Sequence, residues 1–436
     1  MADCVGTQGV SPNNLKQTGF SIIVSAPGKI ILHGEHSVVY GRLAIAASLG
    51  LRTRVTIAEI DAPDSLILQF SNLNLNKTYS LKAFKEHLLN SHLPLTNPPS
   101  EFNWELPDIV HHESLLDKID NFLNTNESTD LSACQAAAVK CIFFLLVGIL
   151  SSVDIELDSV VIDVSTQLDV GAGTGSSASY VVSLSAALLQ YVKSKRECGN
   201  FAKPGFKPSS WHVDLTTFSK KELEMICSWA YCAEKIVHLT PSGLDNTICT
   251  YGSMVEFRKG LSPKLLDITC PFKVLLINTK VPRETKRLVS QVAKMHDKYP
   301  DLVNNILNAM EDVAFIALQN IVALSEIEAI GDTTLQHRNE IDKIFENLGQ
   351  LSSMNHNLLS ALGVSHSKLD EVVHLLAEYG LHGKLTGAGG GGYAIALVPP
   401  RFDHRALDEV IKLLERKGFG VACTVLGGEG VKVESV

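Results

Sequence analysis

The stretch Gly171-Ala-Gly-Thr-Gly-Ser-Ser-Ala178 joins a predicted strand at 157–164 to a predicted helix that begins at Ser176. Three glycines let the backbone approach a ligand closely and point successive N–H groups at one spot, and the helix adds the positive end of its dipole. These features predict an anion site suited to the phosphates of ATP. No lysine lies in the run, so it is not a G-x-x-x-x-G-K-[ST] loop. Taken alone, the stretch also fits a tight strand-to-helix turn that binds nothing.

A second glycine run, Thr386-Gly-Ala-Gly-Gly-Gly-Gly392, contains the spacing G-x-G-x-x-G. In a dinucleotide-binding fold a helix follows that motif directly. Here the apolar stretch at 393–398 is typical of a strand. The pattern therefore argues against a nicotinamide oxidoreductase, and leaves either a loop packed beside a ligand or a plain turn.

A third segment, Ser25-Ala-Pro-Gly-Lys-Ile-Ile-Leu-His-Gly-Glu-His36, lies between strands predicted at 20–25 and 43–59. It contains two histidines and a glutamate, but their spacing is not H-E-x-x-H and no further ligand set is evident. A transition-metal site is therefore not expected here.

Two carboxylates complete the candidate chemistry. Glu234 lies on a predicted helix that opens with the capping-box pair Ser219 and Glu222, and Asp245 follows a Pro-Ser-Gly turn. Near a phosphate loop, two such acids could serve as a magnesium ligand and a general base. Without that context, an acid on a helix and an acid in a turn are commonplace.

Composition limits the class of protein. The 436 residues are 45% hydrophobic and 19% charged, as in a globular enzyme, and a net charge of -9 argues against a nucleic-acid partner. Nine cysteines without a CxxC pair, and an N-terminus unlike a signal peptide, predict a cytoplasmic protein with reduced thiols. The apolar stretch at 141–150 has ten residues, about half of a membrane span, and predicts a buried helix.

Strands and helices are mixed along the chain without a regular βαβ alternation, which favours an α+β fold. Helices are expected at 131–150, 300–325, 334–361, 366–379 and 403–417, and further strands at 273–278 and 420–425. A change of composition near 260–272 suggests two domains, an N-terminal ATP-binding kinase domain at 20–265 and a C-terminal domain at 266–436.

Taken together and in order, the three glycine-containing segments resemble the three motifs of the small-molecule kinase superfamily of galactokinase, homoserine kinase, mevalonate kinase and phosphomevalonate kinase. Within it, the stretch Ser25–Gly41 is most similar to mevalonate kinases. Pro241-Ser-Gly-Leu-Asp-Asn246 and Asn278-Thr-Lys-Val-Pro-Arg-Glu-Thr285 are further matches, and the resemblance extends from about residue 20 to 433.

The resemblance implies an N-terminal domain like the second domain of ribosomal protein S5 and a ferredoxin-like C-terminal domain, with the active site in the cleft between them. It implies transfer of the γ-phosphoryl group of ATP to the 5-hydroxyl of (R)-mevalonate, which gives 5-phosphomevalonate for isoprenoid and sterol biosynthesis. It also implies Mg²⁺ as cofactor, a homodimer, and feedback inhibition by prenyl diphosphates that compete with ATP.

The resemblance also implies roles for individual residues. Asp245 would be the general base, with Lys29 beside it near the substrate hydroxyl and the nucleotide, and Ser177 and Glu234 would hold Mg²⁺. The remaining nucleotide contacts would come from Asn72, Thr166, Gly171, Ala172, Gly173, Thr174, Gly175, Ser176 and Ser177. The substrate pocket would be lined or stabilised by Glu35, His36, Ser242, Arg283 and Thr285.

The glycine loop departs from the family pattern in two respects. Leu168-Asp169-Val170 replaces the usual proline pair before the glycine loop, and Thr174 replaces a leucine. The negative charge of Asp169 is expected to weaken ATP binding. The alternatives are a sister kinase that acts on phosphomevalonate or galactose, and a catalytically silent sensor of the same fold.

Overall fold

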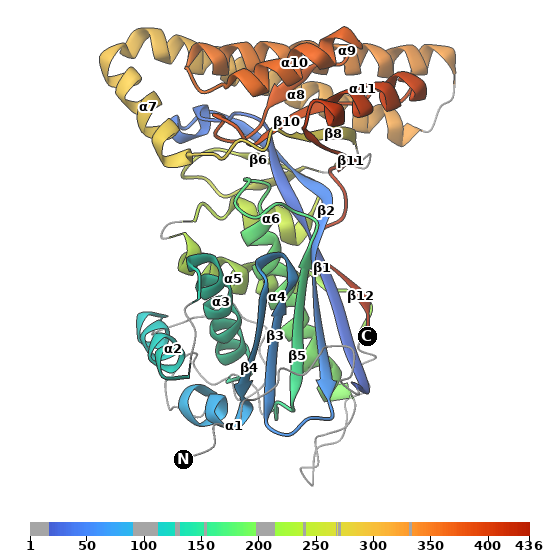
Figure 1. The fold of residues 1–436 in the computed structure, drawn as a ribbon. Helices are drawn as coiled ribbons and strands as arrows, with labels where there is room; N and C mark the ends of the chain where they lie inside the picture. Colours follow the sequence, from blue (N-terminus) through green and yellow to red (C-terminus); the bar gives the residue numbers. More distant parts are fainter. Residues whose placement is uncertain are drawn as a thin grey trace.

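Two 17-residue strands, β1 (Gln17–His33) and β2 (Ala44–Ile60), run side by side and link the two halves of the molecule (Figure 1). This computed structural model describes residues 17–89, 112–126, 131–151, 155–197, 214–238, 241–266, 268, 272–330 and 334–436. The prolines at 94–107 and most of the predicted loop at 195–212 lie outside those ranges. In the described part of the chain, 12 strands form one sheet, so the two halves share a continuous hydrogen-bonded scaffold.

The N-terminal half has the strand order β4-β3-β5-β2, with β1 beside β2. Its other strands are β3 (Ser65–Phe70), β4 (Leu75–Ser80), β5 (Val160–Thr166), β6 (Met254–Phe257) and β7 (Lys264–Leu266). Its helices are η2 (Ser37–Tyr40), η3 (Ser71–Leu73), α1 (Leu81–Phe84), η4 (Lys85–Leu89), α2 (His112–Asn126), α3 (Ala133–Leu150), α4 (Ser176–Glu197), α5 (Lys220–Val237) and α6 (Leu244–Tyr251).

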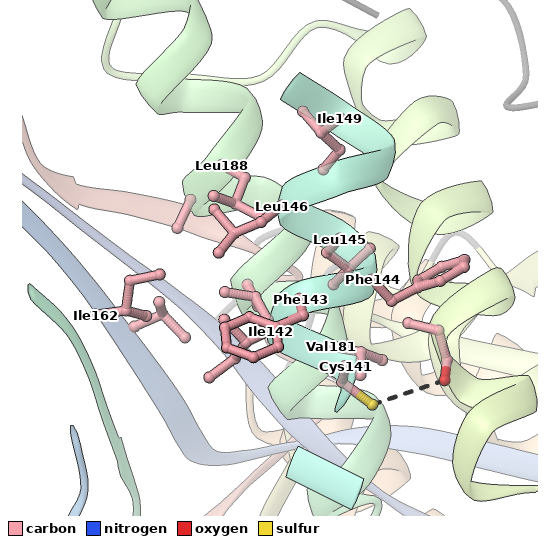
Figure 2. Close-up of a cluster of buried hydrophobic side chains, with 14 of the residues drawn as sticks. Cys141, Ile142, Phe143, Phe144, Leu145, Leu146, Ile149, Ile162, Val181 and Leu188 are labelled. Carbon is pink, nitrogen blue, oxygen red and sulfur yellow. Dashed lines mark hydrogen bonds between the residues drawn. The ribbon is translucent and has the colours of Figure 1, made fainter. Parts of the chain in front are cut away.

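Helix α3 is the predicted apolar helix, and its second half from Cys141 to Leu150 is fully enclosed. Figure 2 shows its phenylalanine and leucine side chains among side chains of α4 and β5, with the Cys141 thiol directed at the backbone oxygen of Ala233. By length and composition, α3 and α8 are the two helices of the described residues that could cross a membrane. In α3, 67% of the residues are buried inside the protein, which agrees with the predicted core helix.

The C-terminal half has the strand order β11-β8-β10-β9, and every neighbouring pair is antiparallel. Numbered along the chain, this order is 4-1-3-2, that of a ferredoxin-like sheet, and it confirms the predicted fold. The strands are β8 (Phe272–Asn278), β9 (Gly383–Leu385), β10 (Tyr393–Leu397) and β11 (Gly420–Leu426). The helices, which gather at the upper end in Figure 1, are α7 (Thr285–Lys298), α8 (Pro300–Ile330), α9 (Leu335–Ala361), α10 (Ser367–Glu378) and α11 (His404–Arg416).

Several elements differ from the sequence-based expectations. The strand predicted to end at residue 25 continues to His33, because the chain absorbs Pro27 and Gly28 as an irregularity in the pairing with β2. Helices α1, α2, α6 and α7 and strands β3, β4, β6 and β7 were not predicted. The last strand, β12 (Lys432–Ser435), returns from the C-terminal half to pair with β1.

Candidate active site

Lys29 and Asp245 form an ion pair at the centre of the site, with Nζ 2.9 Å from Oδ1. Lys29 lies on β1, and Asp245 lies in the first turn of α6. Gly243 precedes that helix with a φ of +78°, a left-handed conformation that turns the chain sharply into α6. The carboxylate keeps 33% of its side-chain surface exposed, against 12% for the lysine. An approaching hydroxyl can therefore reach Asp245 while Lys29 supports it from the protein side.

Glu234 is the second acid of the site and lies in the last turns of α5, a helix that begins with the predicted Ser219–Glu222 capping box. Its side chain is buried. Burial first, and the negative charge of Asp245 second, raise the pKa of Glu234 to about 8, while Lys29 opposes the shift. Lys29, Asp245 and Glu234 therefore form one electrostatic cluster, in which burial and the charge of Asp245 favour the protonated form of Glu234.

The first glycine loop wraps around the backbone of Lys29. Gly171, Gly173 and Gly175 all have left-handed φ angles, of +76°, +82° and +72°. The backbone N–H of Lys29 donates to the oxygen of Thr174 at 2.8 Å, and a Cβ at Gly175 would lie 2.7 Å from Cγ of Lys29. Side chains at these glycines would therefore strain the loop or push it off β1, and α4 begins at Ser176 as predicted.

Two hydroxyls next to this loop are buried without a hydrogen-bond partner among the described residues, those of Thr174 and Ser177. A buried polar atom is ordinarily satisfied, so orphans at the start of α4 fit a site that a ligand completes. The Ser177 hydroxyl and the Glu234 carboxylate are oxygen ligands of the kind that a hard divalent cation prefers. The described residues contain no group of three His, Cys, Asp or Glu side chains that could hold a metal. With one hydroxyl and one carboxylate from the protein, such a cation would take its remaining ligands from phosphate and water.

Arg283 extends from the C-terminal half and lies against the glycine loop of the N-terminal half. A Cβ at Gly173 would overlap its guanidinium group, and a Cβ at Gly387 would lie 2.8 Å from Nη1. The side chain therefore occupies a slot between the two glycine runs. Its Nε is buried without a partner in the described residues, and burial lowers the pKa of Arg283. A desolvated guanidinium beside a glycine loop is suited to bind a phosphate or carboxylate.

Three other predicted substrate residues lie close to these elements. The ring of His36 bonds through Nε2 to the oxygen of Ala388 at 2.8 Å, which ties the end of the Ser25–His36 segment to the second glycine run. Thr285 begins α7, just after Arg283. Ser242 accepts the N–H of Leu244 at 3.3 Å and so supports the turn into the helix of Asp245.

Glu35 is placed differently from the expectation. Its carboxylate pairs with the ammonium of Lys384 and accepts a hydrogen bond from Asn355 Nδ2 at 2.9 Å, and neither charged side chain has any exposed surface. Burial raises the pKa of Glu35, although Lys384 opposes this. The expected substrate contact has no support in this placement, and we expect Glu35 to join the two halves instead. Lys384 was not predicted from the sequence, in which its only signal is its position at the entrance of the second glycine run.

Two of the predicted nucleotide contacts, Asn72 and Thr166, are hydrogen-bonded to each other. The side-chain amide of Asn72 donates to the oxygen of Thr166 at 3.0 Å, and its oxygen accepts the N–H of Thr166 at the same distance. Thr166 ends β5, just before the glycine loop. The pair therefore lies at the start of the segment expected to bind nucleotide.

The family of the chain follows from its relatives. Residues 341–412 match the family model described as GHMP kinases C terminal. The chain is 34% identical over 381 residues to the mevalonate kinase of Bos taurus, covering 87% of this chain and 86% of the relative. It is 32% identical to that of Arabidopsis thaliana, covering 86% and 90%.

Solved structures agree on the fold. A mevalonate kinase structure superposes with a TM-score of 0.61 at 22% identity, covering 93% of this chain and 100% of that one. The mevalonate kinase of L. major in complex with R-mevalonate gives 0.60 at 21% identity, covering 95% and 98%. The identity shared with the curated relatives over most of both chains places this one in a family: it belongs to the mevalonate kinases, a group of ATP-dependent enzymes.

Proposed function

We propose that this enzyme transfers the γ-phosphoryl group of ATP to the 5-hydroxyl of (R)-mevalonate, with Mg²⁺ as cofactor. The observation that carries the proposal is the Lys29–Asp245 pair, which lies against a glycine loop at a helix N-terminus. This arrangement sets a proton acceptor and a cation beside a phosphate-binding backbone.

In the proposed reaction, the substrate oxygen forms a bond to the γ-phosphorus while the bond from that phosphorus to the β–γ bridging oxygen breaks, and ADP leaves. Asp245 accepts the hydroxyl proton, and Lys29 stabilises the developing charge on the oxygen. Backbone N–H groups of the loop, together with Arg283, bind the transferred group and align it. Mg²⁺, held by Ser177 and Glu234, would supply neutralisation of the phosphate charge.

The fold alone does not identify the substrate. The galactokinase of Lactococcus lactis, solved in complex with galactose, also superposes on this structure, with a TM-score of 0.54. The choice of mevalonate rests on the curated relatives. The retention of Lys29, Ser177, Glu234 and Asp245 together favours an enzyme over a silent sensor, because a sensor needs no proton acceptor.

A coupled assay of ADP release tests the proposal, with mevalonate, galactose, homoserine and phosphomevalonate offered separately. Of the four acceptors, we expect only mevalonate to support ADP release. Turnover with another acceptor would redirect the proposal to a sister kinase, and ATP binding without any turnover would indicate a sensor.

We also propose that the enzyme is a homodimer and is inhibited by prenyl diphosphates. A diphosphate carries the same charged groups as the end of ATP, so the glycine loop and Arg283 would bind either. Light scattering gives the mass in solution. Inhibition kinetics should show that added ATP relieves the effect of a prenyl diphosphate, and inhibition independent of ATP would exclude this site.

A further inference from the structure

Asp169 connects the glycine loop to the C-terminal half. Its Oδ2 accepts a hydrogen bond from Nδ2 of Asn278 at 2.5 Å and another from the hydroxyl of Tyr393. Asn278 ends β8 and Tyr393 begins β10, and the two residues are direct partners in the antiparallel pairing of those strands. One carboxylate oxygen thus joins the start of the loop to one pair of facing residues in the ferredoxin-like sheet.

The far end of the same loop is held by the N-terminal half. The Thr174 oxygen accepts the N–H of Lys29, the residue whose side chain pairs with Asp245. The phosphate-binding backbone is therefore anchored to the catalytic pair at one end and to the C-terminal sheet at the other.

The paired residues Asn278 and Tyr393 lie next to the slot that holds the side chain of Arg283. Tyr393 directly follows Gly392, where a Cβ would overlap the side chain of Arg283, and Gly173 closes the slot from the loop side. Burial first, and the hydrogen bond to Asp169 second, raise the pKa of Tyr393, so its hydroxyl remains a donor. The width of the slot between the two glycine runs thus depends on how firmly the loop is held to β10.

We propose that Asp169, Asn278 and Tyr393 form a positioning latch that holds the glycine loop in the geometry that binds ATP phosphates and seats Arg283. The inference rests on the proposed function, because it takes this loop to bind ATP. It reverses the expected role of Asp169. Both donors converge on its carboxylate, so the latch supports nucleotide binding more than the negative charge opposes it.

The sign of the effect on ATP binding tests the latch. Calorimetry with a non-hydrolysable ATP analogue should give a Kd about tenfold higher for Asp169→Ala, since two hydrogen bonds to a charged group are lost. Tyr393→Phe should raise the Kd less, and the double variant should bind no worse than Asp169→Ala, because both changes open one latch. Asp169→Asn keeps an acceptor of the same shape and should retain most of the affinity.

The control is Asp342→Ala, which removes a carboxylate paired with Arg401 on the C-terminal surface and should leave the Kd unchanged. Steady-state kinetics should show a higher KM for ATP in Asp169→Ala with little change in the KM for mevalonate, a split that general loss of stability would not produce. Tighter ATP binding in Asp169→Ala, or an unchanged Kd in that variant, would overturn the latch.

The outcomes separate this inference from the proposed function. If the enzyme phosphorylates mevalonate but Asp169→Ala binds ATP normally, the latch alone is wrong. If the protein binds ATP, loses affinity in Asp169→Ala and phosphorylates no mevalonate, the proposed function is wrong and the latch stands.

Discussion

The ammonium of Lys29 lies 2.9 Å from the carboxylate of Asp245, although the two residues come from the first strand and a short helix near the end of the N-terminal half. The pair is also tied to the glycine loop, since Lys29 donates its backbone N–H to the oxygen of Thr174. In the proposed mechanism, Lys29 thus contacts both the proton acceptor, Asp245, and the phosphate-binding loop. Changes at either site should have effects that can be told apart by kinetics.

Gly173→Val should raise the KM for ATP at least tenfold. The residue has a φ of +82°, and a side chain would overlap Arg283, so the variant strains the loop and displaces the guanidinium together. Steady-state kinetics in a variant with a normal circular dichroism spectrum checks this. Gly418→Val is the matched control. Gly418 lies on the surface with a φ of +91°, and an added Cβ would meet no other atom within 4 Å. Unchanged ATP kinetics would remove the loop from the site.

Glu234→Gln should shift the Mg²⁺ dependence of the rate to higher concentration, by about tenfold or more, because an amide keeps the size of the side chain and removes its charge. A Mg²⁺ titration at fixed ATP measures the shift. Glu224→Gln changes an exposed acid on the same helix and should not move the curve. A curve that also stays in place for Glu234→Gln would show that this acid is no metal ligand.

The metal-free protein should lose stability as pH rises from about 6 to about 8. The pKa of Glu234 is about 8 in the folded protein against 4.5 ordinarily, so between these values the folded state holds a proton that the unfolded state releases. Stability then falls with rising pH until the folded-state pKa is passed. Urea unfolding with a chelator at both pH values should give a smaller loss for Glu234→Gln. Equal losses in the two proteins would assign the pH dependence elsewhere.

Glu35→Ala should destabilise the protein by about 3–5 kcal/mol, the usual effect of leaving a buried charge without its partner. The orphaned charge is that of Lys384, which has no exposed surface. Replacing both residues by methionine should recover much of the loss, because the pair is then replaced by apolar side chains. Denaturant titration measures this. A variant of normal stability with a raised KM for mevalonate would restore the direct substrate contact that the sequence suggested.

The sequence allowed more of the phosphate-binding elements to be predicted than of the contacts between the halves. The start of α4 at Ser176 and the capping box of α5 follow from local signals, namely a glycine run and a Ser-x-x-Glu pattern. Lys384 and Glu35 pair although they lie 349 positions apart, and Asp169 and Tyr393 although they lie 224 positions apart. No local pattern encodes such pairs, because they depend on how the two halves of the sheet are brought together.

Helix α6 was missed for a local reason. Its eight residues are too few to show a helical period, and the glycine before it indicates a turn. The pairing of Asp245 with Lys29 was expected only from the family resemblance.

Asp245→Asn is the measurement that tests the account most directly, because it removes the proton acceptor and keeps its shape. General-base catalysis contributes about 10²–10⁴-fold, so single-turnover phosphorylation of mevalonate should slow by roughly that factor. Binding of an ATP analogue, measured by calorimetry, should survive, since the loop and Arg283 hold the phosphates. Asp408→Asn, an exposed residue of α11, is the control. A near-normal rate for Asp245→Asn would contradict the proposed mechanism, and Asp245 would then be only a residue in the turn into α6.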